Sequence, residues 1–376
     1  MGKKDNVLTI FIANYFETIE NIFGGYGERV FGLYGSYSNN FSSKDHTVLI
    51  FTQRNNTLLT YTNSTIQKIK ENVSPLFLIK FIGERKKSFQ KVRIIASWPD
   101  ISLFGVIIIF ICKYMYNCKI ILDVHDLRTE QLMAFSEKRK NLFLMNFHRI
   151  FTFFIFKLVD LLIITSVNFL NYVAIEYKIN KNKMILIENG TFPEYIFPLE
   201  KPSRNNRFTL AYCGSAAAGK GLIPLINIVE RLKQKIPIVF NIYGGNVLGL
   251  IPNDTLHIKA VPFSQINTVL NQADVLIIPY PKKLYFDITH PIKLSDYMAS
   301  GKPIICLDIQ TTGDIIRKFN CGIVCENYQQ FEEALLYLYT NKDEIPVIGA
   351  HGRVAAITYF DWKNLAQKLY DLTCDI

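Results

Sequence analysis

The sequence predicts two α/β domains of the doubly wound type, in which parallel strands alternate with helices. Three observations lead to this prediction. Short β-branched or aliphatic runs recur along the chain, and segments of helical period lie between most of them. A polar stretch at 198–207, with two prolines and three basic residues, separates near-equal halves. The chain has 376 residues, which is more than one typical core requires. We therefore expect domains at 1–197 and 198–376 that face each other across a cleft.

The expected strands are short apolar runs bounded by turn residues. In the first half they are 7–13, 47–52, 92–96, 119–124, 161–165 and 184–187. In the second half they are 208–213, 238–243, 256–259, 275–279, 303–306 and 322–324. Helical period marks 222–235, 263–271 and 331–340, and also 362–372 after the last strand. This final helix can pack back on the N-terminal domain.

The composition narrows the class of partner. The formal net charge is +10, from 42 basic and 32 acidic residues. This balance favours anionic partners, namely a phosphorylated substrate, a phospholipid surface or nucleic acid. No recognised nucleic-acid-binding module is present, so we do not expect nucleic acid. Hydrophobic residues make up 49% of the chain, which is ample for packed interiors.

No apolar segment of the sequence has the length of a membrane span. The runs at 101–112 and 150–165 are short, and Lys157 and Asp160 interrupt the second. We expect a buried helix in the first and a helix followed by a strand in the second. The seven cysteines form no paired framework, which indicates reduced thiols, and the N-terminus lacks a secretion signal. These features predict a cytoplasmic protein.

The strongest local signal is a glycine turn at 212–221, which follows an expected strand and opens a helix. Gly214 and Gly221 let backbone N–H groups approach a phosphate, and Lys220 adds a positive charge at a helix N-terminus. The spacing is not that of a P-loop, and no Ser or Thr follows Lys220. Phosphate binding and an ordinary strand-to-helix turn both stay open on this segment alone.

The second signal is the segment 290–303, which lies between two expected strands. Asp296 falls on a helix that starts near Pro291, where a carboxylate can accept hydrogen bonds from ribose hydroxyls. Lys293 and the free N–H groups of the helix start can neutralise a diphosphate. The alternative is a solvated helix that happens to carry one acid and one lysine.

Together, the two segments resemble the donor half of GT-B-fold glycosyltransferases, most closely those of family 4. The family has a glycine turn ending in Lys-Gly, a strand ending in a second glycine turn (here 242–245), and a strand introduced by Ala-Asp (here 273–279). An acid-Tyr-Met-Ala-x-Gly-x-Pro segment follows at 296–303, and a Gly-hydrophobic strand and an aromatic-Trp pair close the chain. Order and spacing agree throughout this half.

The N-terminal half is similar in a looser way, and the match through 30–120 is weak. Gly24 and Gly25 belong to a glycine loop where the family faces donor and acceptor. His125 ends a strand where the family often has a histidine that contacts the transferred sugar, and a structural histidine is the alternative. The sequence Glu-Asn-Gly at 188–190 resembles a further signature of this domain.

Two positions depart from the family pattern. The family usually has two acids eight positions apart; Asp296 matches the second, whereas the first falls at Ile288. The adjacent Asp287 is the candidate that would replace it. The family often has an Arg where this chain has Ser215, and Lys293 is the candidate that would supply that charge.

The resemblance implies a retaining glycosyltransferase that moves a sugar from a nucleotide-sugar to a lipid-linked or surface-polysaccharide acceptor, with no metal or other cofactor. The catalytic residues that it implies are His125, Asp126 and Asp287. The donor-binding residues are Gly24, Gly25, Gly214, Ser215, Lys220, Gly221, Tyr243, Gly244, Thr289, His290, Pro291, Ile292, Lys293 and Asp296. A nucleotide-sugar epimerase of the same fold and a catalytically inactive GT-B binding module are the alternatives.

Two segments combine cations with aromatic residues. The segment 83–93 carries five cations and one acid, and 137–157 mixes four cations before Lys157 with several phenylalanines. Such segments suit the interface of an anionic membrane, and a buried helix with a solvated basic end is an equal alternative. The membrane interpretation predicts that the protein contacts the inner face of the cytoplasmic membrane peripherally.

Overall fold

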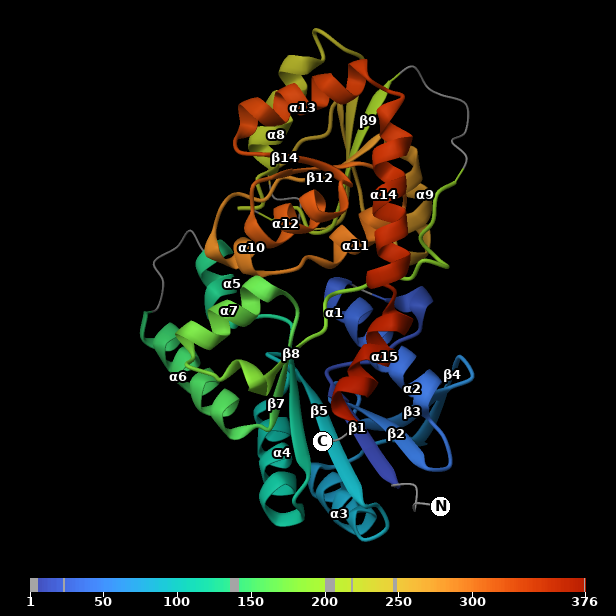
Figure 1. Ribbon diagram of the computed structural model, residues 1–376, viewed down its shortest axis with the longest axis vertical. Coiled ribbons are helices and arrows are strands. Elements are labelled where there is room, and N and C mark those ends of the chain that lie inside the picture. The colour runs from blue at the N-terminus through green and yellow to red at the C-terminus, as the bar shows by residue number, and fades with distance from the viewer. Residues whose placement is uncertain are drawn as a thin grey trace.

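The computed structural model shows two α/β domains stacked along the long axis of the molecule, with both chain ends in the lower one (Figure 1). The structure describes residues 6–22, 24–135, 142–199, 207–217, 219–245, 249–374 and 376. Most of the predicted linker, 200–206, therefore lies outside the described residues.

The N-terminal domain is built on a sheet with the strand order β4-β3-β2-β1-β5-β6-β7-β8. Its strands are β1 (Val7–Ala13), β2 (His46–Thr52), β3 (Thr57–Thr62), β4 (Thr65–Lys70), β5 (Lys91–Trp98), β6 (Lys119–Val124), β7 (Leu161–Ile164) and β8 (Met184–Leu186). From β2 to β8 all neighbours are parallel, so their residues are buried on both faces and form continuous apolar runs. Every strand predicted for this half is present.

The hairpin of β3 and β4 was absent from the prediction. It pairs antiparallel with β2 and turns at Asn63 and Ser64, whose φ angles of 51° and 58° give the two-residue turn that suits a twisted hairpin. β4 is the edge strand, and nearly all its side chains are exposed. An exposed edge strand carries little of the hydrophobic pattern on which the prediction relied.

Helices cover both faces of this sheet. One face is covered by α3 (Pro75–Lys86), α4 (Leu103–Tyr116), α6 (Leu142–Leu158) and α7 (Val167–Glu176). The other is covered by a π-helical segment (Val30–Gly35), α2 (Ser36–Phe41) and α15 (Trp362–Thr373). The helices α1 (Gly24–Arg29) and α5 (Arg128–Phe135) lie at the end that faces the C-terminal domain. Among the described helices, none is both long enough and apolar enough to cross a membrane.

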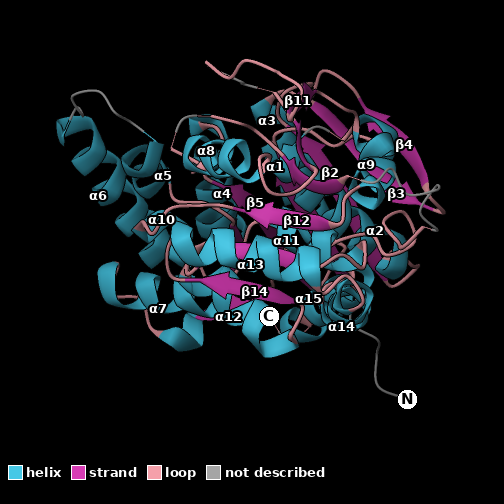
Figure 2. Ribbon diagram, turned by 90° about the horizontal axis from the view of Figure 1, so that it is seen from above, coloured by secondary structure: helices cyan, strands magenta, loops and turns pink. Residues whose placement is uncertain are grey.

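The C-terminal domain has a parallel sheet with the order β11-β10-β9-β12-β13-β14, and helices surround its strands in both views (Figures 1 and 2). The strands are β9 (Phe208–Cys213), β10 (Ile238–Tyr243), β11 (Leu256–Lys259), β12 (Val275–Ile278), β13 (Ile304–Leu307) and β14 (Gly322–Cys325). The helices are α8 (Leu222–Leu232), α9 (Ile266–Gln272), α10 (Leu284–Ile288), α11 (Ile292–Ala299), α12 (Gln310–Phe319), α13 (Tyr328–Thr340) and α14 (Glu344–Tyr359). All seven cysteines of the chain are free.

Two segments that pass between the domains lie side by side. Thr191 N donates to Phe360 O over 2.8 Å, and Trp362 N donates to Thr191 O over 3.2 Å. Beyond this point α15 packs on the N-terminal sheet, where Trp362 is fully buried. A Cβ atom on Gly32 would lie 2.4 Å from the indole of Trp362, so the absence of a side chain at Gly32 makes room for the ring.

Candidate functional site

Two glycine turns meet at the carboxyl ends of β9 and β10. Gly214 N donates to Tyr243 O over 2.8 Å, and a Cβ atom on Gly244 would lie 2.0 Å from Gly214 O. Gly221 has a φ of +76°, and a Cβ atom there would lie 1.8 Å from Pro279 O. No side chain fits at Gly221 or Gly244, so the backbone of the two turns can lie close to a ligand. Helix α8 starts directly after Gly221 and directs its N-terminal amides here.

Lys293 of α11 reaches this turn from the opposite side. Its Nζ atom lies 3.7 Å from the ring centroid of Tyr212 and 5.3 Å from that of Tyr280. A Cβ atom on Gly214 would lie only 2.6 Å from the same Nζ. The Nζ atom is buried and has no hydrogen-bond partner among the described residues. Burial and the nearby Lys220 charge lower the pKa of Lys293 well below its usual range.

Lys220 is the second cation of this turn. Burial lowers its pKa to about 8. Its Nζ atom lies 5.6 Å from the ring centroid of Phe135, which belongs to α5 of the N-terminal domain. Two desolvated lysines that repel each other beside a glycine turn form a site suited to an anion with more than one negative charge.

Asp296 lies one turn after Lys293, at the contact between the domains. Thr191 donates from Oγ1 to Asp296 Oδ1 over 2.8 Å, and the carboxyl group of Glu28 in α1 also hydrogen-bonds Asp296. Burial raises the pKa of Asp296 to about 7. Burial and the Asp296 charge raise the pKa of Glu28 well above its ordinary value. A hydrogen bond between two carboxyl groups requires a proton on one of them, and burial disfavours the loss of that proton.

The predicted glycine loop of the N-terminal domain meets the start of α11. A Cβ atom on Gly25 would lie 3.4 Å from Cδ1 of Ile292, so these two predicted residues are in contact. Gly24 has a φ of +70°, and no atom of the described residues lies within 4 Å of its Cβ position. Pro291 precedes α11 in an extended conformation and leaves the first amides of the helix free.

Three further predicted residues make hydrogen bonds within the C-terminal domain. Ser215, Tyr243 and Thr289 each take part in a hydrogen bond that involves a side chain. The pairs are Tyr212 OH to Ser215 O (2.9 Å), Tyr243 OH to Gln272 Oε1 (3.3 Å) and Thr289 Oγ1 to Tyr285 O (2.8 Å).

His290 is buried and uncharged. Its ring packs edge-on against Phe360, with centroids 5.4 Å apart, and its carbonyl oxygen accepts from Asn189 Nδ2 over 2.6 Å. Burial and the Arg29 charge lower the pKa of His290 to about 3. This environment suits a packing role between the domains.

His125 follows β6 at its carboxyl end. Its Nε2 lies 2.8 Å from Asp100 Oδ2, and its Nδ1 lies 3.5 Å from Ser97 Oγ. The ring of Tyr26 packs against it with centroids 5.3 Å apart. These contacts fix the orientation of the imidazole beside the glycine loop.

Asp126 links the two domains next to His125. Its Oδ2 accepts from Gln131 Nε2 over 2.8 Å and from Tyr285 OH, on α10 of the C-terminal domain, over 3.1 Å. Burial raises the pKa of Asp126 to about 6. The structure therefore brings Asp126 to the face of the N-terminal domain that meets α10.

Asp287 and Ile288 are the last two residues of α10. Asp287 Oδ1 accepts from the backbone N of Gln310 over 3.0 Å, so its carboxylate caps the start of α12. Ile288, at the position of the missing acid, is buried and joins the apolar core of the N-terminal domain. Helix α10 thus presents an apolar contact where the family pattern has an acid.

Arg29 holds together several segments near the site and was not predicted. Its Nη2 lies 2.6 Å from Asp123 Oδ1, and its Nη1 donates to Asn189 Oδ1 over 2.8 Å and to the carbonyl of Glu188 over 3.1 Å. The signal in the sequence was an Arg that follows the glycine loop and an Asp at a strand end. Only the folded chain shows that the two form one buried ion pair.

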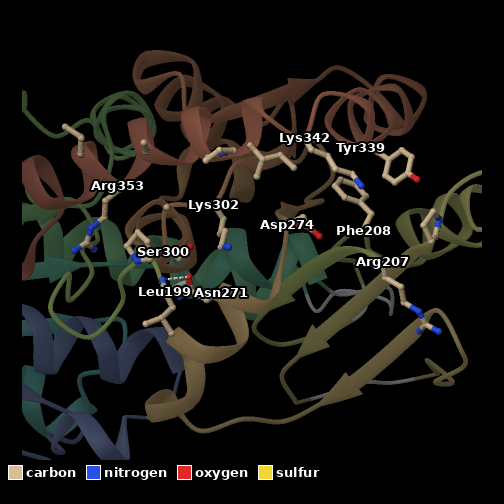
Figure 3. A pocket seen from close by; sticks show the side chains of 17 residues that line it. Leu199, Arg207, Phe208, Asn271, Asp274, Ser300, Lys302, Tyr339, Lys342 and Arg353 are labelled. Atoms are coloured by element: carbon tan, nitrogen blue, oxygen red, sulfur yellow. Dashed lines mark hydrogen bonds between the residues drawn. The ribbon is translucent and has the colours of Figure 1, made fainter. Parts of the chain in front are cut away.

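A cavity of about 850 Å³ lies elsewhere in the C-terminal domain (Figure 3). Phe208, Asp274 and Lys302 line it, and these residues stand at the amino ends of β9, β12 and β13. Lys342, between α13 and α14, and Arg353 of α14 also line it. Open α/β sheets bind ligands beyond the carboxyl ends of their strands, so this cavity is distinct from the donor site.

Residues 207–341 match the family described as glycosyl transferases group 1. The match contains both glycine turns and α11, which are the segments that carry the predicted donor site. A comparison with curated protein sequences finds no match. The family match confirms the predicted glycosyltransferase domain and the enzyme class.

Solved structures of glycosyltransferases resemble the whole chain. One is sucrose-phosphate synthase from Thermosynechococcus elongatus, with a TM-score of 0.72 and 14% identity over 98% of both chains. A second is Anabaena Alr3699/HepE in complex with UDP-glucose, with a TM-score of 0.69 and 13% identity over 98% of this chain and 100% of that one. WaaG, a glycosyltransferase involved in lipopolysaccharide biosynthesis, has a TM-score of 0.63 and 14% identity over 97% and 99%. These similarities confirm the predicted GT-B fold.

Proposed function

We propose that this GT-B glycosyltransferase moves a sugar from a nucleotide-sugar to a lipid-linked or surface-polysaccharide acceptor, with retention at the anomeric carbon. The observation that carries the proposal is the buried Lys293, whose Nζ has no hydrogen-bond partner among the described residues. A diphosphate against Gly214 and the start of α8 would give Lys293 and Lys220 an anionic partner.

The demanding step is the departure of the nucleoside diphosphate while positive charge grows on the sugar ring. Lys220, Lys293 and the first amides of α8 stabilise the leaving phosphate electrostatically, and they do so best in a site shielded from water. In this proposal the two lysines, rather than a metal ion, neutralise the diphosphate.

The N-terminal domain orients the sugar in this proposal. Asp100 and Tyr26 hold the ring of His125, so His125 can position the sugar without rearrangement. Beside it, Asp126 hydrogen-bonds Tyr285 from the other domain, which sets the distance between the two halves of the site.

The solved relatives suggest the first substrates to test. Alr3699/HepE was solved with UDP-glucose, which makes UDP-glucose the first donor for this chain. WaaG is involved in lipopolysaccharide biosynthesis, which supports a glycan on a lipid as the acceptor class.

The outer face of α6 supports an acceptor held in a membrane. Phe143, Phe147, Ile150 and Phe154 recur every three or four residues and are each more than half exposed. Both views place α6 at the outer edge of the molecule (Figures 1 and 2). A helix that leaves such a stripe in water costs free energy, and burial of the stripe in the acyl boundary of a bilayer removes this cost.

Other exposed side chains lie on helices that cover the same face of the sheet. Leu103 and Phe104 at the start of α4 are exposed, and so are Arg85 and Lys87 at the end of α3. Of the predicted basic residues of the α6 region, three (Lys138, Arg139 and Lys140) lie outside the described residues, and the fourth pairs with Glu176. Exposed cations such as Arg85 and Lys87 favour an anionic surface, as at the inner face of a cytoplasmic membrane.

Replacing Lys293 with Met should weaken the binding of UDP-glucose by about 1.5–3 kcal/mol, roughly tenfold or more, because a charge-assisted contact with the diphosphate is lost. The same loss is expected for Lys220→Met. Stability should not fall in Lys293→Met, since a buried ammonium without a hydrogen-bond partner among the described residues gives way to an apolar chain of similar length. Calorimetric titration and thermal unfolding measure the two quantities.

Lys235→Met, at an exposed lysine before β10, is the matched control and should bind as the wild type does. A panel of UDP-, GDP- and ADP-sugars replaces UDP-glucose where the wild type does not bind it. Wild-type affinity in both lysine variants, with the fold intact, would refute the phosphate site. Conversion of the nucleotide-sugar without any acceptor would identify an epimerase instead.

Vesicle binding tests the membrane surface. The wild type should sediment with vesicles that contain anionic lipid, and less so as salt rises, because exposed charges are screened beyond about 8 Å at physiological ionic strength. Serine at Phe147 and Phe154 should reduce sedimentation at every salt concentration, since apolar burial is lost. Ile223→Ser, at an exposed apolar residue of α8, is the control. Equal binding to neutral and anionic vesicles would contradict an electrostatic contribution to membrane binding.

A further inference from the structure

We propose that Glu28, from the N-terminal domain, is the second acidic residue of the donor site and accepts a hydrogen bond from a hydroxyl group of the donor. The inference rests on the proposed function, since the ligand is a nucleotide-sugar. The hydroxyl belongs to the ribose or to the transferred sugar, and the experiment below distinguishes the two.

Helix α10 supplies no free acid at the place where the resemblance expects one. Ile288 packs into the apolar core of the N-terminal domain, and its side chain is 4% exposed. Asp287 already accepts the first amide of α12. A second carboxyl group of the donor site would therefore come from another element.

Glu28 has the position that this role requires. It follows the glycine loop, and α1 contacts α11 where Gly25 meets Ile292. Its side chain is buried against Asp296, at 5% exposure, and its Oε1 atom has no hydrogen-bond partner among the described residues. Lys293 Nζ, one turn before Asp296, is likewise without a partner among them. An unsatisfied acceptor and an unsatisfied cation thus flank Asp296, and one ligand with hydroxyl and phosphate groups can satisfy both.

The shared proton explains how two acids coexist in this site. Asp296 faces Glu28, Thr191, Lys293 and the thiol of Cys213, and of these only Glu28 is a second carboxyl group. Burial and Asp296 raise the pKa of Glu28, so Glu28 keeps the proton and donates it to Asp296. The other oxygen of Glu28 is then a neutral carbonyl acceptor, which suits a sugar hydroxyl in a dry site.

Substitutions at Glu28 test this assignment. Glu28→Gln keeps a donor toward Asp296 and a carbonyl oxygen at the same reach, so UDP-glucose affinity should stay within about twofold. Glu28→Met keeps the volume but loses both groups, and affinity should fall about tenfold, as expected for one hydrogen bond left unmade. Glu28→Asp shortens the side chain by one methylene, and its affinity for UDP-glucose should also fall. If Glu28→Met does not fold, the affinities of Glu28→Gln and Glu28→Asp for UDP-glucose are compared instead.

Each variant is titrated with UDP and with UDP-glucose. Loss of affinity for both ligands assigns the hydroxyl to the ribose, and loss for UDP-glucose alone assigns it to the transferred sugar. Wild-type affinity of a folded Glu28→Met, or rescue by Asp but not by Gln, would overturn the inference. A wild type that binds no nucleotide-sugar of the panel would instead refute the proposed function.

The pH dependence of folding stability gives a second test of the shared proton. A change in packing alone does not alter this dependence. The folded-state pKa values of Glu28 and Asp296 lie above their unfolded values, so the stability that the pair contributes is present below about pH 4 and is lost as the pH rises toward the folded pKa of Asp296, about 7. Glu28→Gln removes one of the two titrations and should flatten this part of the stability profile. Identical profiles in wild type and Glu28→Gln would overturn the shared proton.

Discussion

Replacing Asp123 with Ala should lower the free energy of unfolding by about 3–5 kcal/mol, because Arg29 is left charged and buried without its carboxylate. Both side chains are nearly inaccessible, and their closest atoms are 2.6 Å apart. Tyr34 also loses the acceptor of its hydroxyl group, which donates to Asp123 Oδ2 over 3.0 Å. Urea denaturation of the two proteins measures the difference.

A double-mutant cycle with Arg29→Met separates the ion pair from its surroundings. Arg29 also donates to Asn189 and to the carbonyl of Ile187, so Arg29→Met is destabilising by itself. The double variant should nevertheless lose less stability than the two single losses sum to, since no unpaired charge remains buried. Additivity within about 0.5 kcal/mol would contradict the ion-pair interpretation.

Replacing Trp362 with Ala should cost about 3–5 kcal/mol of unfolding free energy, because a fully buried indole leaves a cavity that the backbone around it cannot fill. The ring occupies the space above Gly32 and also lies against Gly190, so the N-terminal domain loses part of its contact with α15. Chemical denaturation followed by circular dichroism measures the loss.

Tyr359→Ala is the control for this prediction, because Tyr359 stands three residues earlier and is 54% exposed. It should change stability by less than about 0.5 kcal/mol. A loss in Trp362→Ala as small as that expected for Tyr359→Ala would contradict the contribution of Trp362 to the N-terminal core.

The fold was largely readable from the sequence because its strands are parallel. A strand buried on both faces is a short unbroken apolar run, and 208–213, 238–243 and 256–259 coincide with β9, β10 and β11. The hairpin of β3 and β4 was not predicted, because β4 is exposed to solvent and the side chains of β4 are mostly polar. Its two-residue turn, Asn63-Ser64, was the one local signal.

The candidate site could likewise be predicted only in part. The glycine turns and Lys293 follow from local rules, because a positive φ or a helix start constrains neighbouring residues only. The partners of Asp123 and Asp296 could not be predicted, since Arg29 lies 94 positions before Asp123 and Glu28 lies in the other domain from Asp296. The first pair forms when the N-terminal domain folds and the second when the two domains meet, and a pattern within one sequence does not encode either. The same holds for Asp100, which the folded chain brings to His125.

The placement of α15 governs the order in which the chain can complete its folding during translation. The C-terminal domain is continuous from β9 to α14 and leaves the ribosome before Trp362 does. The N-terminal sheet is made first, yet one of its faces is only partly covered, by residues 30–41, until Trp362 and Leu369 are added. The domain synthesised first is thus the one finished last. In that interval its uncovered apolar face is the surface that a chaperone would bind, and any delay in translation after α14 lengthens this exposure.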